Sequence, residues 1–324
     1  MYLFLFLGIG HDISENHYNF KEIMQLMGIQ DMEFLKHIDD LKALRIKEGM
    51  QGHSSTYNCD WCWGKSPFDR DDYFLRTYKS LNDNFNGFKA LCEEVGERKA
   101  LKEAKNYKNV VNMPLLKGPD EKEVIMDAPP EELHLRLGTV NKVADSLEAA
   151  MSADIDEHHP SLYHWMHSHS IVGLKYRGGA LDGPNITKLL RLIDANVEEP
   201  KKNLADFVPE KFQPFVDCLR LFKQVGHACF GMELLDDWRE KIRDFEVSYR
   251  SLNISVTPKV HSIFYEVPIF IERTGKALGN FTAQKFEAIH HDFKTTWENY
   301  KRPENHPQFG QQLKNSVVAY NSYH

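Results

Sequence analysis

The sequence predicts an α/β fold that is interrupted by a large, mostly helical insertion. Three observations lead to this prediction. The first fifty residues read as strand, helix, strand and helix, which is the order typical of an α/β layer. Residues 151–258 read almost wholly as helix, and the tail carries a helical stripe of apolar side chains. We therefore expect a layered core over residues 1–150, a helical insertion over 151–258 and C-terminal helices over 259–324.

The layered part begins with an apolar run that we interpret as a buried strand, Met1–Gly8. This run lacks the basic start and the small-residue cleavage site of a signal peptide, and it is too short to span a bilayer. A short helix over Tyr18–Met27 and a second strand over Met32–Ile38 follow. The alternation of the two element types is what favours an α/β layer.

The next elements follow from helix-start signals and from apolar runs. Asp39 and Asp40 stand where an N-cap belongs, directly before a predicted helix over Leu41–Met50. Asn109–Leu116 is a further strand candidate, and a helix is expected over Glu132–Met151, after a pair of prolines. Two loops are then expected inside the helical insertion, at residues 177–179 and 182–185.

The tail has the most regular helical pattern of the chain, because five large apolar residues follow one another at spacings of 3, 4, 4 and 3. They lie on one face of a helix that Pro303 ends. The stripe consists of Phe286, Ile289, Phe293, Trp297 and Tyr300.

The composition sets limits on function. The chain has 324 residues, of which 42% are hydrophobic, so it can bury a sizeable core. A net charge of −7 confines any contact with nucleic acid to a local basic patch. Five scattered cysteines favour a reducing compartment over a disulfide framework. The phosphate-binding and zincin motifs G-x-x-x-x-G-K-[ST], G-x-G-x-x-G and H-E-x-x-H do not occur.

Cys59 and Cys62 form a C-x-x-C pair that could supply half of a tetrahedral zinc site. A redox pair would instead be expected to open a helix of a thioredoxin-like unit, and two unrelated reduced thiols are a further reading. His261 and Glu266 could complete the zinc site, because five residues along a helix approach the same face. Taken alone, two such residues are more often an ordinary pair on a helix surface.

Two acidic residues stand where chemistry could occur. Asp40 follows a predicted strand and could point off the carboxyl edge of a sheet, although a plain N-cap is the alternative. Glu287 lies at the margin of the apolar stripe, and Glu287-x-x-His290 has the spacing of carboxylate-bridged metal sites. The histidines at 164, 167 and 169 lack a nearby set of thiols or carboxylates, so we expect a solvated or packing role for them.

Four landmarks stand together in a recognisable order along the whole chain. They are Asp40-Leu-Lys, the segment from Gly52 through Cys59-Asp-Trp-Cys62, the segment from Val260-His261 to Glu266-Val-Pro, and Leu278-Gly-Asn-Phe-Thr-Ala-Gln-Lys-Phe-Glu287. This order resembles the RNase H-like catalytic region of DDE-type transposases of animal mobile elements. It is more distantly similar to Transib transposases and to the catalytic subunit of the V(D)J recombinase.

The resemblance implies a partial RNase H-like core, with Asp40 and Glu287 as the second and third catalytic acids. These would bind Mg²⁺ or Mn²⁺ for two-metal phosphoryl transfer. The resemblance also implies a structural zinc site. Its ligand positions match Cys59, Cys62 and His261, and Glu266 stands where the family usually has a second histidine. The implied partner is DNA, with a homodimer allowed, no membrane contact and a nuclear location.

The same resemblance leaves the activity open. The first catalytic aspartate of the family has no counterpart in this sequence, so the chain is expected to be truncated at its N-terminus and impaired in DNA cleavage. Two alternatives remain: a zinc-stabilised relic that binds DNA or protein without chemistry, and an unrelated helical metalloenzyme that uses Glu287, His290 and the histidines of residues 164–169.

Overall fold

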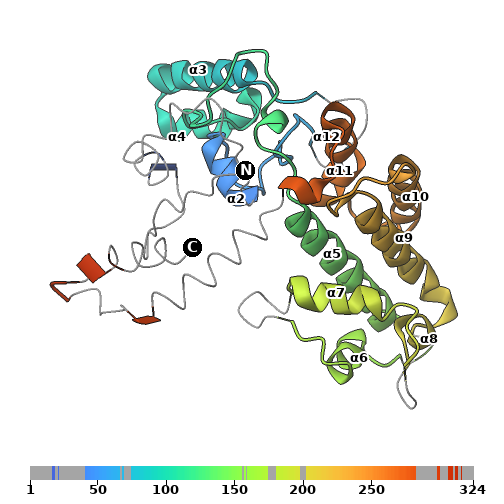
Figure 1. The fold of residues 1–324 in the computed structure, drawn as a ribbon. Helices are drawn as coiled ribbons and strands as arrows, with labels where there is room; N and C mark the ends of the chain where they lie inside the picture. The colour runs from blue at the N-terminus through green and yellow to red at the C-terminus, as the bar shows by residue number, and fades with distance from the viewer. Residues whose placement is uncertain are drawn as a thin grey trace.

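The computed structural model describes residues 41–65, 68, 74–154, 157, 159–173, 180–197 and 202–281, and a few separate positions outside these ranges. The described part is built from helices (Figure 1). The main α-helices are α2 (Leu41–Lys47), α3 (Tyr78–Val95), α5 (Glu132–Ser152), α6 (Leu162–Ser168), α7 (Gly183–Arg191), α9 (Gln213–Cys229), α10 (Trp238–Ser251), α11 (Pro258–Phe264) and α12 (Glu266–Thr274). The shorter elements are α4 (Glu97–Ala100), α8 (Leu204–Phe207) and the 3₁₀ helices η3 (Leu101–Tyr107), η4 (Val124–Met126), η6 (Glu210–Phe212) and η7 (Leu278–Phe281).

The predicted α/β RNase H-like core is wrong. The residues that the structure describes contain no strand and no sheet, and their only β-type pairs are three isolated bridges. The two N-terminal strand candidates, Met1–Gly8 and Met32–Ile38, lie outside the described residues, as do most of the predicted helix Tyr18–Met27 and all five residues of the tail stripe.

The third strand candidate, Asn109–Leu116, shows why the pattern misled. Val110, Leu115 and Leu116 are buried as expected, whereas Met113 is exposed, and the backbone pairs with the end of α2 and not with another strand. The amides of Val111 and Leu115 donate to Gly49 and Lys47 at 2.9 and 2.7 Å. A short apolar run fits a buried strand or any buried extended segment, and its periodicity cannot separate the two.

Local capping explains where several helices begin. Thr77 and Ser80 form a reciprocal capping box at the start of α3, and the Glu131 side chain caps α5. The helix predicted over Glu132–Met151 is therefore present with nearly the expected bounds. Asp182 caps α7, so residues 183–185, which were expected to be a loop, are the first turn of that helix. The other predicted loop, residues 177–179, lies outside the described residues.

One apolar core joins the described helices, with members from Leu44 to Leu278. In Figure 1, α9 and α10 lie side by side, with α11 and α5 next to them. Aromatic rings fill the contact between α9, α10 and α11: Phe245 lies 5.2 Å from Phe222 and 5.6 Å from Phe264 between ring centroids. Burial of rings of this size contributes strongly to stability.

A small second cluster joins α3 to α4 and η3 through Phe88, Ala100 and Ala104. Between these helices and the larger group lie residues 51–65 and 74–77, an irregular segment that Figure 1 draws in blue. None of the helices in the described part has both the length and the apolar character needed to cross a bilayer. The irregular segment carries the C-x-x-C pair and so positions the site described next.

Candidate metal centre

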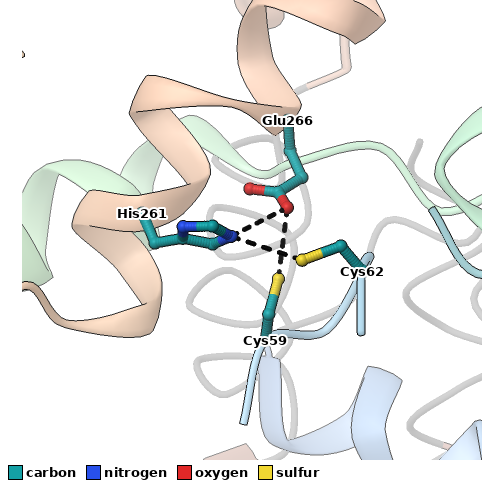
Figure 2. Close-up of side chains that lie close together, drawn as sticks. All are labelled: Cys59, Cys62, His261 and Glu266. Atoms are coloured by element: carbon teal, nitrogen blue, oxygen red, sulfur yellow. Dashed lines mark hydrogen bonds and ion pairs between the residues drawn. The ribbon is translucent and has the colours of Figure 1, made fainter. Parts of the chain in front are cut away.

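Four buried side chains meet where the irregular segment contacts α11 and α12: Cys59, Cys62, His261 and Glu266 (Figure 2). Each is at most 2% exposed. One potential ligand atom from each residue lies within 4.8 Å of all the others. Because two of these residues stand about 200 positions after the other two, a metal ion here would join distant parts of the chain.

The separations between the ligand atoms suit a tetrahedral ion. The Nε2 atom of His261 lies 3.3 Å from the Cys62 sulfur and 3.3 Å from Oε1 of Glu266. The Cys59 sulfur also lies 3.3 Å from Glu266 Oε1. Zinc bonds of about 2.0–2.3 Å at tetrahedral angles place ligand atoms about 3.3–3.8 Å apart. The cluster could therefore hold a metal such as zinc with little movement.

Both sulfurs of the C-x-x-C loop point into the cluster (Figure 2). The backbone amide of Trp61 donates to the Cys59 sulfur at 3.5 Å, and that of Gly64 donates to the Cys62 sulfur at 3.2 Å. Such N–H···S bonds stabilise thiolates. A Cβ atom at Gly64 would lie only 3.0 Å from the Cys62 sulfur and 3.3 Å from His261 Nε2. The absence of a side chain at residue 64 thus leaves room for the four ligands.

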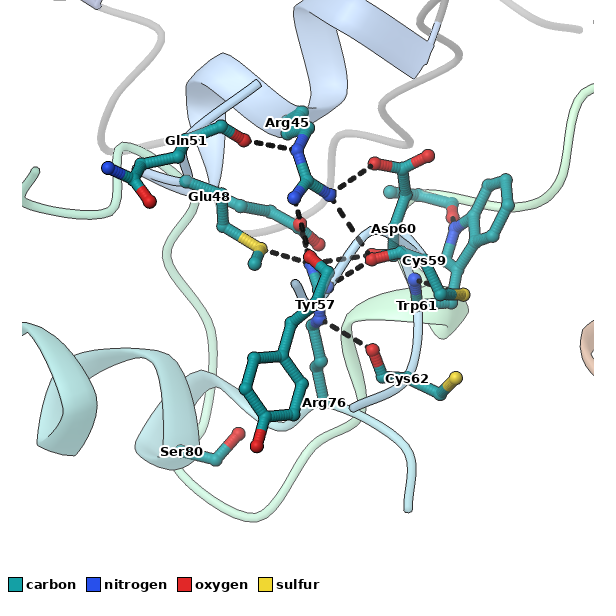
Figure 3. A network of polar contacts seen from close by, with 12 residues as sticks. Arg45, Glu48, Gln51, Tyr57, Cys59, Asp60, Trp61, Cys62, Arg76 and Ser80 are labelled. Atoms are coloured by element: carbon teal, nitrogen blue, oxygen red, sulfur yellow. Dashed lines mark hydrogen bonds and ion pairs between the residues drawn. The ribbon is translucent and has the colours of Figure 1, made fainter. Parts of the chain in front are cut away.

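Two buried arginines hold this loop from behind (Figure 3). Arg76 is fully buried and donates to three carbonyls of the loop, those of Cys59, Asp60 and Cys62. It also pairs with the buried carboxylate of Glu48. Arg45 donates to the same Cys59 carbonyl and pairs with the carboxylate of Asp60, both at 3.3 Å. Each buried arginine has a carboxylate partner, as buried charges require.

An abrupt bend between α11 and α12 brings His261 and Glu266 together. On a continuous helix, five residues correspond to a rotation of about 140°, which would separate the two side chains. Tyr265 leaves the helical conformation, with φ −123° and ψ −55°, and α12 begins at the next residue. Pro268 explains the break, because it has no amide hydrogen for the Phe264 carbonyl and its ring would clash with that group. The two residues meet as expected, but through this bend and not through their spacing on one continuous helix.

The surroundings of the last two ligands also fit a metal. The Phe68 ring stacks on the His261 imidazole at 4.3 Å between centroids. The second carboxylate oxygen of Glu266, Oε2, is buried and makes no hydrogen bond to a described residue. A buried carboxylate oxygen without a donor is costly in an apolar interior. A cation at the centre of the cluster would offset this cost.

The pKa values of the clustered side chains also favour a bound cation. Burial raises the pKa of Glu266 to about 7, with the charge of Cys59 adding to the effect. Burial opposes the charged form of His261, but the Glu266 carboxylate and the Cys59 sulfur outweigh it and raise the imidazole pKa to about 10. Burial also opposes the Cys59 thiolate, yet hydrogen bonds from Cys62 and His261 hold the Cys59 pKa well below its usual range. Without a metal, protons occupy the place of the cation, and metal binding must release them.

The predicted catalytic residues cannot be placed. Asp40, Glu287 and His290 lie outside the described residues, and so does any Mg²⁺ or Mn²⁺ site that they would form. The histidines of α6 belong to no metal cluster among the residues that the structure describes. His164 and His167 are exposed, whereas His169 is buried against the Trp165 ring at 4.4 Å. These positions agree with the solvated and packing roles expected for them.

The sequence did not reveal the residues that support the cluster. Gly64, two positions after the second cysteine, was the one signal in the sequence of a residue that supports the cluster. A small residue there lets a backbone amide approach the sulfur. Arg45 and Arg76 carry no such signal, since neither stands in a motif with the cysteines. In Asp182 and Pro184 the sequence did carry a helix-start signal, which the loop interpretation overlooked.

No family model and no curated protein matches the chain. The chemistry of the site therefore has to be argued from its own residues.

Proposed function

We propose that Cys59, Cys62, His261 and Glu266 bind one structural zinc ion. The observation that carries this proposal is the complete burial of a Cys₂-His-Glu donor set with the spacing of a tetrahedral site. Structural zinc sites use all four positions for protein ligands, whereas catalytic sites keep one open to water or substrate. Burial of all four groups here favours the structural role.

The zinc ion would fasten the irregular segment, at the C-x-x-C pair, to the bend between α11 and α12. Thiolates and an imidazole select zinc over the hard cations Mg²⁺ and Ca²⁺, which prefer sets of oxygen ligands. Because the four ligands converge only in the folded chain, the free energy of zinc binding contributes directly to the free energy of folding.

Metal analysis of the purified chain tests the proposal. We expect about one zinc per chain, lost in Cys59→Ser and retained in Cys92→Ser. Cys92 is a matched control because it lies on α3 and outside the cluster. Iron in place of zinc, or zinc that persists in Cys59→Ser, would contradict the proposed ligand set.

We further propose, from the order of sequence motifs, that the chain derives from a DDE-type transposase, that its partner is DNA, and that it acts in the nucleus. What supports this is the succession of Asp40, the C-x-x-C pair, the late His261 and Glu266, and Glu287. The ancestral activity would be DNA strand cleavage and transfer, with Asp40 and Glu287 binding Mg²⁺ or Mn²⁺.

Nicking of supercoiled DNA in Mn²⁺ tests the second proposal. Activity that is lost in Asp40→Asn and in Glu287→Gln, with zinc content unchanged, would support a surviving active site. DNA binding without nicking would support a relic that retains only the partner. A chain that neither nicks nor binds DNA would contradict the proposal that its present function involves DNA.

A further inference from the structure

A row of positively charged side chains runs along one edge of η3. Lys102, Lys105 and Lys108 follow one another at a spacing of three residues, with the last as the C-cap. In a 3₁₀ helix, side chains three positions apart lie above one another, and each step of three advances the chain by about 6 Å. The three lysines therefore share one edge about 12 Å long. Arg98 on α4 extends this cationic row by about one turn.

The opposite side of this helical stretch is buried against α3, which lies beside α4 in Figure 1. Ala100 and Ala104 are at most 2% exposed and cluster with Phe88. The Tyr107 ring lies 6.0 Å from the Phe88 ring between centroids. A Cβ atom at Gly87 would lie 2.7 Å from this tyrosine ring, so the glycine lets the ring lie directly on the α3 backbone. The packing on α3 thus directs the cationic row outward.

The cationic row carries charge that no carboxylate neutralises in the described part of the chain. The side chains of Arg98, Lys102 and Lys105 are exposed and form no ion pair or hydrogen bond there. The Nζ atom of Lys108 donates to the Tyr57 hydroxyl at 3.0 Å and lies 4.4 Å from the centroid of its ring, a contact that keeps the ammonium charge. On α3, by contrast, each of the two lysines pairs with a carboxylate four residues later, at 2.6 and 4.0 Å.

Two glutamates of the same stretch lie off the cationic row. Glu103 directly follows Lys102, so it is turned about 120° from the lysine edge. Its carboxylate accepts a hydrogen bond from the side chain of Asn106 at 3.0 Å. Glu97 directly precedes Arg98, which corresponds to a rotation of about 100° on an α-helix. Neither glutamate therefore lies on the edge that carries the lysines.

We propose that the cationic row binds the phosphate backbone of DNA. The net charge of −7 requires that any attraction to DNA be local, and the row supplies such a place. Phosphates recur about every 3.4 Å along each strand of a duplex, so a row about 12 Å long meets about three of them. Evenly spaced charges of one sign match this repeat, whereas an acidic protein surface has no such repeat.

The contact would position DNA without reading its sequence, because lysine binds phosphate as a point charge. This inference rests on the DNA partner proposed above and names the surface that holds it. It does not depend on whether Asp40 and Glu287 form an active site.

Anisotropy of a short fluorescent DNA duplex, titrated with the full chain at several salt concentrations, tests the proposal. We expect the double variant Lys102→Gln/Lys105→Gln to weaken DNA binding about tenfold at low salt. The slope of log affinity against log salt should become shallower by about two, because each lost phosphate contact removes about 0.9. Lys223→Gln/Lys276→Gln is the matched control: it removes the same charge from exposed lysines on α9 and after α12, and should leave the affinity within about twofold.

Equal DNA binding by wild type and the Lys102→Gln/Lys105→Gln variant would overturn this inference and leave the DNA partner standing. A wild-type chain that binds no duplex even at low salt would overturn both. Poly-glutamate that displaces the duplex at an equal concentration of charge would assign the cationic row to an acidic protein and overturn the assignment to DNA. Zinc content and melting temperature equal to those of wild type show that both variants are folded.

Discussion

At the scale of single residues, the proposed metal site depends on groups that hold the ligands as much as on the ligands. Arg76 is the clearest case, since its guanidinium contacts three carbonyls of the C-x-x-C loop and the buried carboxylate of Glu48. Burial raises the pKa of Glu48 to about 8, although the charge of Arg76 opposes that rise. Removal of the arginine would take this donor from the carbonyls of Asp60 and Cys62 and from the carboxyl group of Glu48.

We predict that Arg76→Met lowers the free energy of unfolding by about 3–5 kcal/mol, because breaking a buried ion pair leaves its partner unpaired. Denaturant titration measures this change. Arg239→Met is the control: Arg239 is 65% exposed and pairs with Glu272 on the surface, so its loss should cost less than about 1 kcal/mol. Equal effects of the two substitutions would show that Arg76 does not anchor the loop.

Gly64 provides a second test at the same scale. We predict that Gly64→Ala weakens zinc binding about tenfold, the lower end of what changes around metal ligands cost. The added methyl group would meet the Cys62 sulfur and the His261 ring. Gly52→Ala, where a Cβ atom has no neighbour within 4 Å, should leave the affinity unchanged. Competition with a chromophoric chelator measures both affinities, and wild-type affinity in Gly64→Ala would refute the proposed crowding.

At the scale of elements, the bend between α11 and α12 decides which side chains share the site. Its cause is local, because Pro268 denies the Phe264 carbonyl a helical donor. Its consequence is long-range, because His261 and Glu266 then face the same loop. A straight helix would have directed one of the two away from the cysteines.

We predict that Pro268→Ala weakens zinc binding by about tenfold, since alanine allows a continuous helix that separates His261 from Glu266 by about 140°. Pro214→Ala is the control, because Pro214 lies in the first turn of α9, where no helical partner is lost. The same competition assay applies. Unchanged affinity in Pro268→Ala would mean that packing of α12 maintains the bend without proline.

At the scale of the whole molecule, the metal would couple the irregular segment to the helical core. Anything that binds only the folded state stabilises it by an amount that grows with ligand concentration, about 2.7 kcal/mol at one hundred times the dissociation constant. We predict that the melting temperature rises with free zinc and falls on chelation. Calorimetry should show neither response in Cys59→Ser, whereas a chelation response equal to that of wild type in this variant would place the metal elsewhere.

The sequence predicted those parts of the fold and of the metal site that depend on interactions between residues close together in the chain. The C-x-x-C pair was visible because its geometry lies within four residues. The choice of His261 and Glu266 rested on an assumed common helix face, while the structure brings them together through a bend at Pro268. The helix of Glu132–Ser152 was predictable from its flanking signals. The irregular conformation of Asn109–Leu116 was not, because its backbone partner is the end of α2 and not a neighbouring strand.

X-ray absorption at the zinc edge of the purified chain tests the central claim most directly. The account predicts a shell of two sulfur atoms at about 2.3 Å and two nitrogen or oxygen atoms at about 2.0–2.1 Å. It also predicts that one sulfur is lost from any zinc that remains in Cys62→Ser. A shell without sulfur, or one of four sulfurs, would contradict the ligand set of Cys59, Cys62, His261 and Glu266.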